Sequence, residues 1–382
     1  MYDLAVIGGG ILGTFHAYHA LQMGLTVALF EKNKEPQGAT VRNFGQIVPS
    51  GMNPKWQALG RQSLAIYQAI QQQFNISIVK NGSIYLASNA QEVQLIEELH
   101  QINKANDYPS ELLTAEACLK KYPALRKDYC RAGLFFPDEL SADPRYMIHQ
   151  IQTYLRQNPR FTHFTQTLIT QIDTQTNACK LTDHLKKTYQ AQKVALCCGS
   201  EFELLYPHLF YQSDMEVVKL QMLRLQPNTS VKLPGNILTG LTIRRYESFQ
   251  QCPSYQAIKA TENPQAYHKK WGIHLLFKQE ADGSIIVGDS HEYADAQHKD
   301  QLDFFIRDDI NRYFIEETKK ILNLPNLQIQ TQWAGFYAQG KNTDIFYHNL
   351  HDKVHITTAI GGKGMTAGPG FALQNIKTIF NQ

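Results

Sequence analysis

The chain has 382 residues, of which 43% are hydrophobic and 19% are charged, and its formal net charge is +3. This length predicts two or three domains with a sizeable buried core. Lysine and arginine are dispersed and no apolar run approaches the roughly 20 residues of a membrane span, so we expect neither a nucleic-acid partner nor an integral membrane segment.

The first thirty-one residues predict a strand, a helix and a second strand. Tyr2–Ile7 ends in apolar residues, residues 8–13 have the GxGxxG spacing, and Thr14–Met23 is an apolar helical stretch. Thr26–Phe30 then predicts a buried strand that ends at Glu31. A strand before this glycine motif and a helix after it are the context in which the motif binds a dinucleotide.

Each residue type in this unit has a chemical reason. Gly8 permits the tight turn, Gly10 lets a pyrophosphate approach the backbone, and Gly13 lets the helix pack against the strand. The N-terminus of the helix then presents free N–H groups to the anion. Glu31 can accept the ribose hydroxyls, and its charge disfavours a 2′-phosphate.

Further elements follow from periodicity, turn and cap signals. We expect a hairpin at Asn81-Gly82 and a turn at Asp282-Gly283, strand-like runs throughout residues 217–277, and a glycine-rich loop over residues 360–370. The expected helices cover residues 54–74, 91–103, 114–121, 304–322 and 371–380, with another beginning at Asp143-Pro144, and the other expected strands cover residues 76–87, 133–137, 161–172, 188–196, 275–279, 285–287, 328–333 and 354–358.

The six cysteines predict neither a disulfide framework nor a metal site. They form no CxxC pair, and no group of cysteines and histidines has the spacing of a zinc site. Reduced thiols are typical of cytoplasmic proteins, so we expect that location. We expect no metal.

Four segments after Glu31 resemble those of one family. They are residues 38–46; residues 194–200; residues 333–337 with Asp344 downstream; and residues 361–370. In this order they are similar to the second flavin loop, the strand ending in A-x-G-A-W, the W-x-G…T-x-D segment and the last glycine loop of the D-amino-acid oxidase/glycine oxidase superfamily of FAD-dependent oxidoreductases. Cys198 stands where this superfamily usually has threonine or alanine, and the proline after the acid is missing.

Three further segments resemble a clade within this superfamily. They are residues 241–246, 272–276 and 287–293, and the loop at 41–45 is similar as well. That clade is associated with the breakdown of aminophosphonates in bacteria. The resemblance therefore implies a substituted aminoethylphosphonate as one class of substrate.

The resemblance implies an α/β fold (α+β overall) with two interwoven domains. A Rossmann-like FAD-binding domain is expected from residues 1–76, 143–213 and 328–382. A second, mostly antiparallel β-sheet domain is expected from residues 77–142 and 214–327, and it binds the substrate. No cysteine follows Cys252, so covalent attachment of flavin through a C-terminal cysteine is excluded and FAD is expected to be non-covalent.

The glycine motif and the resemblance together imply the residues that hold FAD. Backbone N–H groups at 362–366 open the last expected helix and place a positive dipole where the reduced flavin ring gains charge. The cofactor-binding residues are expected to be Gly8, Gly10, Ile11, Leu12, Gly13, Glu31, Lys32, Thr40, Arg42, Asn43, Phe44, Gly45, Cys198, Gly199, Trp333, Gly362, Lys363, Gly364, Met365 and Thr366.

The implied reaction is the oxidation of a small anionic amine, either a substituted aminoethylphosphonate or an amino acid. Hydride passes to flavin N5, water hydrolyses the imine, and O₂ or another acceptor removes the electrons. Two alternatives stay open: an FAD-dependent 2-hydroxy acid dehydrogenase and a non-catalytic FAD-binding protein. The C-terminal glycine loop argues against a nicotinamide dehydrogenase.

An anionic substrate group needs a cation, and arginine matches oxyanions best. If residues 241–246 form a strand, Arg244 and Arg245 point to opposite faces, so one of them reaches the substrate. No acid–base residue is obligatory if the amine arrives neutral, so we assign no catalytic residue and expect no histidine–aspartate pair. The expected substrate-binding residues are Arg245, Tyr246, Arg244, Gln46, His291 and Lys363.

Overall fold

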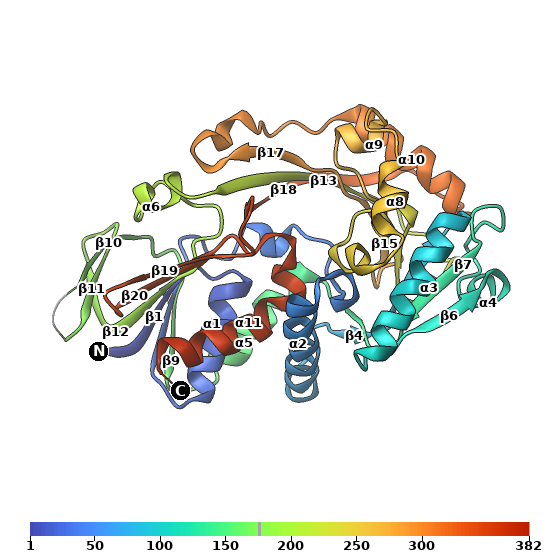
Figure 1. Cartoon of the computed structure of the whole chain (residues 1–382). Helices are drawn as coiled ribbons and strands as arrows, with labels where there is room; N and C mark the ends of the chain where they lie inside the picture. The colour runs from blue at the N-terminus through green and yellow to red at the C-terminus, as the bar shows by residue number, and fades with distance from the viewer. Residues whose placement is uncertain (175–176, 382) are drawn as a thin grey trace.

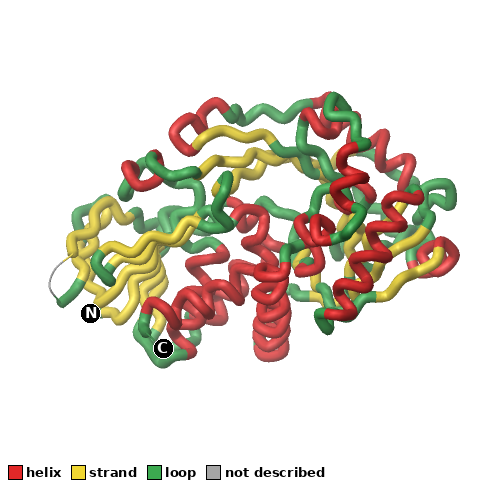
Figure 2. The backbone as a smooth tube through the Cα atoms, in the orientation of Figure 1, coloured by secondary structure: helices red, strands yellow, loops and turns green. Residues whose placement is uncertain are grey.

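The computed structural model describes residues 1–174 and 177–381, and its strands form two large sheets and one small sheet. Figure 1 shows the first large sheet at one end of the molecule, with α1 (Ile11–Gln22), α5 (Pro144–Leu155) and α11 (Gly364–Ile379) beside it. The second large sheet extends over the top and the other end, and Figure 2 shows the strands gathered in these two groups. None of the helices in the described residues is both long and apolar enough to span a bilayer.

The first sheet is built around the N-terminal unit. β1 (Tyr2–Ile7) pairs in parallel with β2 (Val27–Phe30) on one side and with β12 (Thr188–Leu196) on the other. The sheet runs β10-β11-β12-β1-β2-β9, and β20 pairs with both β12 and β19. The remaining strands are β9 (Phe161–Phe164), β10 (Ile169–Thr174), β11 (Cys179–Asp183), β19 (Phe346–Leu350) and β20 (Val354–Thr358).

Helices cover this sheet through a shared apolar core. Leu4 and Val6 of β1 are fully buried against Phe15 of α1, whose ring meets Tyr67 of α2 (Pro54–Gln73) edge-on at 5.4 Å between centroids. This burial of apolar side chains is the main force that holds the layers together.

The last helix begins earlier than expected. The glycine-rich residues were expected to form a loop up to residue 370, but after the short helix η5 (Gly361–Lys363), α11 starts at Gly364. Glycine normally disfavours helices. Here a Cβ on Gly370 would lie 2.2 Å from the carbonyl oxygen of Leu59, so small residues are needed for α11 to pack against α2.

The second sheet has nine strands in the order β17-β13-β16-β15-β14-β5-β7-β6, with β18 paired to β13. All of these pairs are antiparallel except β14 with β5. The expected fold class is therefore confirmed. The strands are β5 (Ser83–Ala87), β6 (Glu111–Thr114), β7 (Ala132–Phe136), β13 (Met215–Leu225), β14 (Asn236–Leu238), β15 (Leu276–Gln279), β16 (Ile285–Gly288), β17 (Glu292–Asp295) and β18 (Ile329–Gly340).

Two expectations about this half of the chain are wrong. Residues 240–270 form no strand: they fold as α7 (Gly240–Ile243), η3 (Glu247–Gln251), α8 (Tyr255–Ala260) and α9 (Tyr267–Lys270). Asn81-Gly82 joins two strands without forming a hairpin, because β4 (Val79–Lys80) pairs with β8 (Leu140–Ser141) instead of β5. In both cases tertiary partners override the local pattern.

The other expected elements lie close to their expected positions, and the structure adds several short elements that were not predicted. β3 (Gln46–Ile47) completes the small sheet in the order β3-β8-β4. The remaining helices are η1 (Ala39–Val41), η2 (Pro49–Gly51), α3 (Ala90–Ala105), α4 (Ala115–Lys121), α6 (Pro207–Tyr211), η4 (Ala296–Gln301) and α10 (Asp308–Ile321). The division into two domains stays a prediction, and β18, which was expected in the first domain, pairs with the second sheet.

Candidate active site

A cavity of about 660 Å³ lies where the two large sheets approach each other. One end is lined by the glycine turn after β1 and by Glu31, and the other by side chains of the second sheet region such as Arg245 and His291. Between these ends lie Leu220 and Met222 of β13. A single elongated ligand can therefore touch both halves of the molecule.

The glycine turn forms a tight cradle at the first end. Gly8 has φ +104°, and a Cβ there would lie 2.3 Å from the carbonyl oxygen of Cys197. Gly13 does not line the cavity, but a Cβ there would lie 1.9 Å from the carbonyl oxygen of Gly8. Both positions therefore demand glycine, Gly8 for the turn and Gly13 for the contact between α1 and β1.

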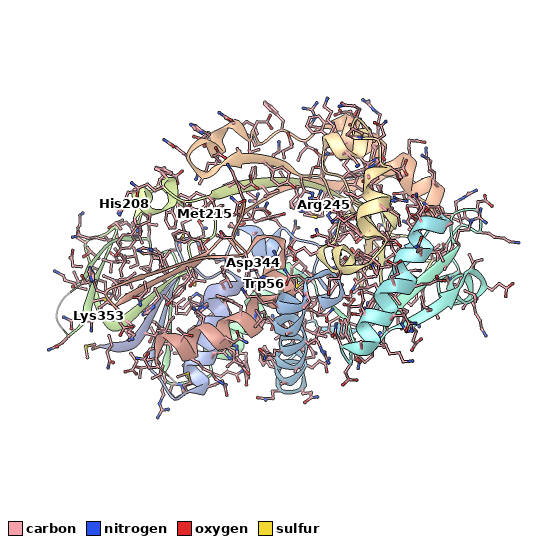
Figure 3. The ribbon with its side chains drawn as sticks, viewed as in Figure 1. Trp56, His208, Met215, Arg245, Asp344 and Lys353 are labelled. Carbon is pink, nitrogen blue, oxygen red and sulfur yellow. The ribbon has the colours of Figure 1, made fainter. Side chains whose placement is uncertain are left out.

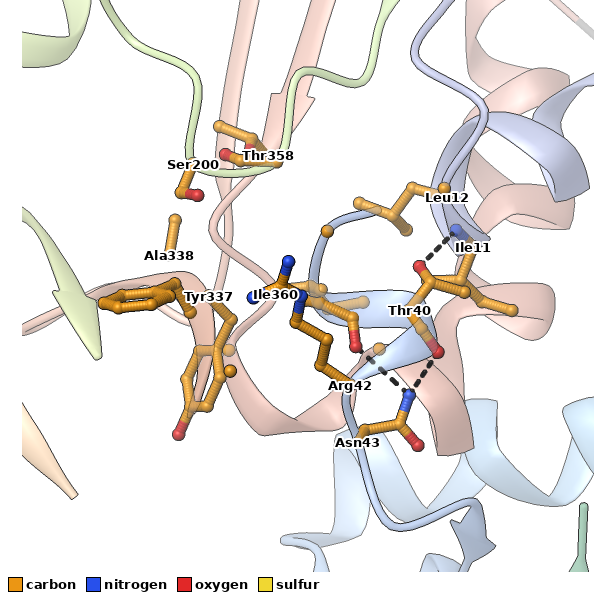
Figure 4. Close-up of a pocket in the computed structure, with 18 of the residues that line it drawn as sticks. Ile11, Leu12, Thr40, Arg42, Asn43, Ser200, Tyr337, Ala338, Thr358 and Ile360 are labelled. Carbon is orange, nitrogen blue, oxygen red and sulfur yellow. Dashed lines mark hydrogen bonds between the residues drawn. The ribbon is translucent and has the colours of Figure 1, made fainter. Parts of the chain in front are cut away.

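Side chains from other elements fix this turn. The Glu31 carboxylate accepts the Gly9 N–H through Oε2 at 3.0 Å and the Asn33 N–H through Oε1 at 2.9 Å. The Thr40 hydroxyl accepts the Ile11 N–H at 2.9 Å, as Figure 4 shows. Residues expected to bind the cofactor that line this end are Gly8, Gly10, Ile11, Leu12, Glu31, Lys32, Thr40, Cys198 and Gly199.

The segment after η1 lines the middle of the cavity, but its polar groups bond mostly to the protein. Arg42 donates to the carbonyl oxygens of Gln37 and Ala334, at 2.8 and 3.1 Å. Asn43 donates to the carbonyl of Thr40 at 2.7 Å (Figure 4). Phe44 also lines the cavity, while Gly45 lies outside it, against Ala142 and Lys278.

The start of α11 lines the cavity opposite this segment. Gly362 of η5 and Gly364, Met365 and Thr366 of α11 all contribute to its wall. Lys363 lies there too, but its Nζ pairs with Glu247 Oε1 at 3.0 Å and lies 3.9 Å from Asp344. Its charge is therefore already partly neutralised by the protein.

Two other residues expected at the site lie outside the cavity. Trp333 donates to the carbonyl of Arg42 and packs under the guanidinium of Arg145. The Arg244 guanidinium pairs with Glu92 at 2.9 Å and Glu262 at 3.4 Å. Residues 244–246 follow the helical turn α7 rather than continuing a strand, so the expected alternation of their side chains does not apply.

Arg245, in contrast, lines the substrate end of the cavity. Its Nη2 donates to the Tyr293 hydroxyl at 2.9 Å, and Figure 3 shows it in the half of the molecule that holds the second sheet. Tyr246 lines the same end, and burial raises the pKa of its hydroxyl. Gln46 lies deeper, where its Nε2 donates to the carbonyl of Phe277 and its Oε1 has no hydrogen-bond partner among the described residues.

A His–Asp–His cluster, formed by His274, Asp289 and His291, also lines this end. One nitrogen from each histidine and one carboxylate oxygen lie within 4.8 Å of one another, and His274 Nε2 lies 2.8 Å from Asp289 Oδ1. The expectation of no histidine–aspartate pair is therefore wrong. The sequence analysis did not predict His274 or Asp289 as site residues. Their segments, residues 272–276 and 287–293, were noted only because they resemble those of a clade.

Asp289 brings a negative charge to the cluster. Burial raises the pKa of Asp289, but His274, His291 and Arg245 lower it more, so the pKa lies below its ordinary value and the carboxylate is ionised near pH 7. Burial lowers the pKa of His291 to about 3, which keeps that ring neutral. The substrate end therefore combines the guanidinium of Arg245 with the carboxylate of Asp289.

Comparison with known proteins identifies the family. The model of the FAD dependent oxidoreductase family (DAO) matches residues 3–374, which is nearly the whole chain. The chain belongs to this family. As a DAO-family protein it is an FAD-dependent oxidoreductase.

Solved structures show the same fold. Glycine oxidase from Geobacillus kaustophilus has a TM-score of 0.78 and 14% identity, with 100% of this chain and 95% of that chain covered. L-proline dehydrogenase from P. horikoshii has a TM-score of 0.76 and 17% identity, with 99% and 93% covered. At these identities the likeness establishes the fold alone.

Relatives by sequence are distant or cover only part of the chain. Mouse mitochondrial sarcosine dehydrogenase is 27% identical over 146 residues, which are 37% of this chain and 16% of that protein. Glycerol 3-phosphate dehydrogenase of Caloramator mitchellensis is 22% identical over 389 residues, with 100% of this chain and 74% of that protein covered. The chain thus spans about a sixth of the length of the sarcosine dehydrogenase.

The residues of the cavity fit the FAD that the DAO family uses. The cradle at Gly8 and Gly10 leaves room for a pyrophosphate beside the backbone, and Glu31 stands where a ribose hydroxyl can donate to it. The N-terminus of α11 supplies a positive dipole on the opposite wall. Bound FAD supplies the hydride acceptor, and the protein orients the substrate and excludes water.

Proposed function

We propose that this chain oxidises a small amine that carries an anionic group, either a substituted aminoethylphosphonate or an amino acid. The neutral amine would give a hydride to FAD and become an iminium ion, which water hydrolyses to a carbonyl compound and a released amine or ammonium ion. The electrons leave to O₂ or another acceptor. The observation that carries this proposal is Arg245, a guanidinium in the cavity wall that forms no salt bridge with any carboxylate of the described residues.

The contacts of the neighbouring cations support this choice. Arg244 and Lys363 both form ion pairs with carboxylates, at 2.9 and 3.0 Å for the closest contacts. Among the described residues no carboxylate oxygen lies within 4.0 Å of the Arg245 guanidinium nitrogens, which donate instead to the Tyr293 hydroxyl. A planar guanidinium with unused donors suits a phosphonate or carboxylate.

Several further assignments belong to this proposal. Non-covalent FAD lies along the cavity, with its pyrophosphate at Gly8–Gly13 and its ribose on Glu31. The substrate lies between the flavin and the second sheet, held by Arg245 with Tyr246, while Gln46 and His291 line its pocket. The thiols of all six cysteines are free, which supports a cytoplasmic location.

The reaction is tested by anaerobic bleaching of the flavin with a panel of compounds. The panel contains N-methyl-2-aminoethylphosphonate, glycine, sarcosine, lactate and glycerol 3-phosphate. We expect an anionic amine to bleach the flavin and lactate and glycerol 3-phosphate to leave it oxidised. Bleaching by lactate alone would establish the 2-hydroxy acid dehydrogenase alternative, and bleaching by glycerol 3-phosphate alone would contradict both readings. No bleaching by any compound would favour a non-catalytic FAD-binding protein.

The role of Arg245 is tested by Arg245→Met. We expect KM for the anionic amine to rise at least about tenfold, because a charge-assisted hydrogen bond is lost, while flavin content stays unchanged. Arg312→Met removes an exposed arginine of α10 and serves as the matched control. An equal loss of activity toward a neutral amine would show that Arg245 is structural.

A further inference from the structure

The cavity presents an anion as well as a cation to its contents. The Asp289 side chain is 10% exposed and that of His274 is 6% exposed, and both line the cavity beside Arg245. A buried ionised carboxylate is costly unless it is paired or hydrogen-bonded. We therefore ask whether a group of the bound ligand pairs with the Asp289 carboxylate.

Protein groups do not fully satisfy this carboxylate. Asp289 Oδ1 lies 2.8 Å from His274 Nε2, but the two groups are not oriented for a hydrogen bond, so Oδ1 has no hydrogen-bond partner among the described residues. The other titratable groups facing it are His291, Arg245, Tyr246 and Tyr337. None of the tyrosines donates to it within hydrogen-bonding distance in the described structure.

His291 offers a second acceptor beside the carboxylate. Its Nδ1 lies 2.9 Å from the carbonyl oxygen of Gly272, which can only accept, so Nδ1 carries the proton. In the neutral ring Nε2 then has a free lone pair. Burial lowers the pKa of His291 to about 3, and this supports the neutral form.

We propose that Asp289 and His291 bind the ammonium group of the substrate, while Arg245 binds its anionic end. A protonated secondary amine has two N–H bonds, and the carboxylate and the imidazole nitrogen provide one acceptor for each. One ring nitrogen of His291 and one carboxylate oxygen of Asp289 lie within 4.8 Å of each other, so the two side chains are close enough to contact the same ammonium group. The inference rests on the proposed function, since it names the group that recognises the amine of that substrate.

A divalent metal is the competing occupant of the cluster, because two histidines and a carboxylate are common metal ligands. The hydrogen bonding of His274 favours the ammonium. A histidine that binds a metal almost always donates its other ring N–H to a partner. His274 Nδ1 is buried without any such partner among the described residues.

Paired ligands separate recognition of the amine from recognition of the anion. N-methyl-2-aminoethylphosphonate and butylphosphonate have the same chain length, but a methylene replaces the amine in the second. Their affinities for the FAD-loaded protein are measured by anaerobic calorimetry with the flavin reduced beforehand, so that the amine is not oxidised during the titration, for the wild type and for Asp289→Asn and His291→Gln. The control is His208→Gln on α6, which Figure 3 shows far from Arg245.

We expect Asp289→Asn to weaken binding of the aminophosphonate at least about tenfold, since a hydrogen bond to a charged group is lost. Binding of butylphosphonate is expected to change less than about twofold. His291→Gln is likewise expected to weaken binding of the aminophosphonate more than binding of butylphosphonate. Equal weakening of both ligands, or of neither, in both variants would overturn the inference. Loss of binding in EDTA that Zn²⁺ restores would also overturn it and identify a metal site.

The outcome for the proposed function is read separately. If the wild-type flavin is bleached by the amine but neither variant discriminates between the two phosphonates, only the inference on Asp289 and His291 fails. If no amine bleaches the wild-type flavin and neither phosphonate binds, the proposed function itself fails. Flavin content of each variant, measured from its absorbance, shows whether it has folded.

Discussion

Glu31 performs two tasks with one carboxylate. Its Oε2 accepts the Gly9 N–H and its Oε1 accepts the Asn33 N–H, so it holds the glycine turn in place from the end of β2. It also lines the cavity. Acceptor sites that remain on the two oxygens are available to a ribose hydroxyl, because an ionised carboxylate offers about four.

Glu31→Ala should therefore weaken FAD binding. The change removes a charged acceptor whose hydrogen bonds contribute about 1.5–3 kcal/mol, and it also releases the Gly9 N–H. Fluorescence titration of the apoprotein with FAD measures the effect, which we expect to be a rise in Kd of at least about tenfold. An unchanged Kd would mean that the ribose lies elsewhere, and Glu35→Ala, an exposed acid nearby in the chain, is the control.

The choice between Arg244 and Arg245 shows what the sequence could not decide. Two adjacent arginines were correctly expected to differ in direction, but the reason was wrong, because the segment is a helical turn rather than a strand. Arg244 is directed to Glu92, which lies about 150 residues away in the chain. Partners at such separations leave no signal in a local pattern.

At the scale of elements, Glu139 joins parts of the chain that are distant in sequence. Its Oε1 accepts the Ser50 N–H of η2 at 2.8 Å and the Tyr108 hydroxyl, beyond α3, at 2.9 Å. Burial raises the pKa of Glu139 to about 7, while its hydrogen bonds with Ser50 and Tyr108 lower it. The protonated acid is therefore the form that the folded chain prefers at mildly acidic pH.

This raised pKa predicts a dependence of stability on pH. Between about pH 4.5 and 7 the unfolded chain loses the Glu139 proton and the folded chain keeps it, so the contribution is complete below pH 4.5 and is lost as pH rises through 7. The glutamine of Glu139→Gln stays neutral at every pH. The free energy of unfolding of this variant, relative to that of the wild type, should therefore increase by up to about 3 kcal/mol as the pH is raised from 4 to 8. Urea unfolding at both pH values tests this, and a constant difference between the two proteins would contradict it.

Elements with strong local signals were predicted well. Thr114 and Asp143 cap α4 and α5 through their side chains, as the sequence indicated. The Asp282-Gly283 turn was predicted as well, and the pairing of Leu276 with Gly288 that follows from it brings His274 toward Asp289. The hairpin brings the two segments of the cluster together, but its register continued by two residues sets His274 opposite Ser290 rather than Asp289, so the turn alone could not reveal the cluster.

The whole molecule places its cavity between two sheets whose strands come from interleaved segments. Residues from the N-terminal turn, from β13 and from the start of α11 meet there, although they are more than a hundred residues apart. The sequence predicted the flavin end of this arrangement from its glycines. For the other end it named Arg245, Tyr246, Gln46 and His291 as candidates but missed His274 and Asp289, which come from separate segments that meet only in the folded chain.

A ligand that spans the cavity should therefore stabilise the molecule more than one that fills only part of it. In the proposed placement FAD reaches from the Glu31 end to the substrate end, whereas FMN lacks the AMP half and would leave the Glu31 end empty. Because a ligand that binds only the folded state stabilises it by about 2.7 kcal/mol at a hundred times its Kd, the unfolding temperature of the apoprotein should rise by several degrees with FAD and less with FMN.

The same comparison in Glu31→Ala determines which end produces the difference. If the adenosine half contributes through Glu31, the advantage of FAD over FMN in unfolding temperature should shrink in this variant, while the effect of FMN itself stays close to that in the wild type. Thermal unfolding followed by circular dichroism, with each flavin at equal concentration, gives the four unfolding temperatures: wild type and variant, each with FAD and with FMN. An advantage of FAD that is unchanged in the variant would show that the adenosine half does not bind through Glu31.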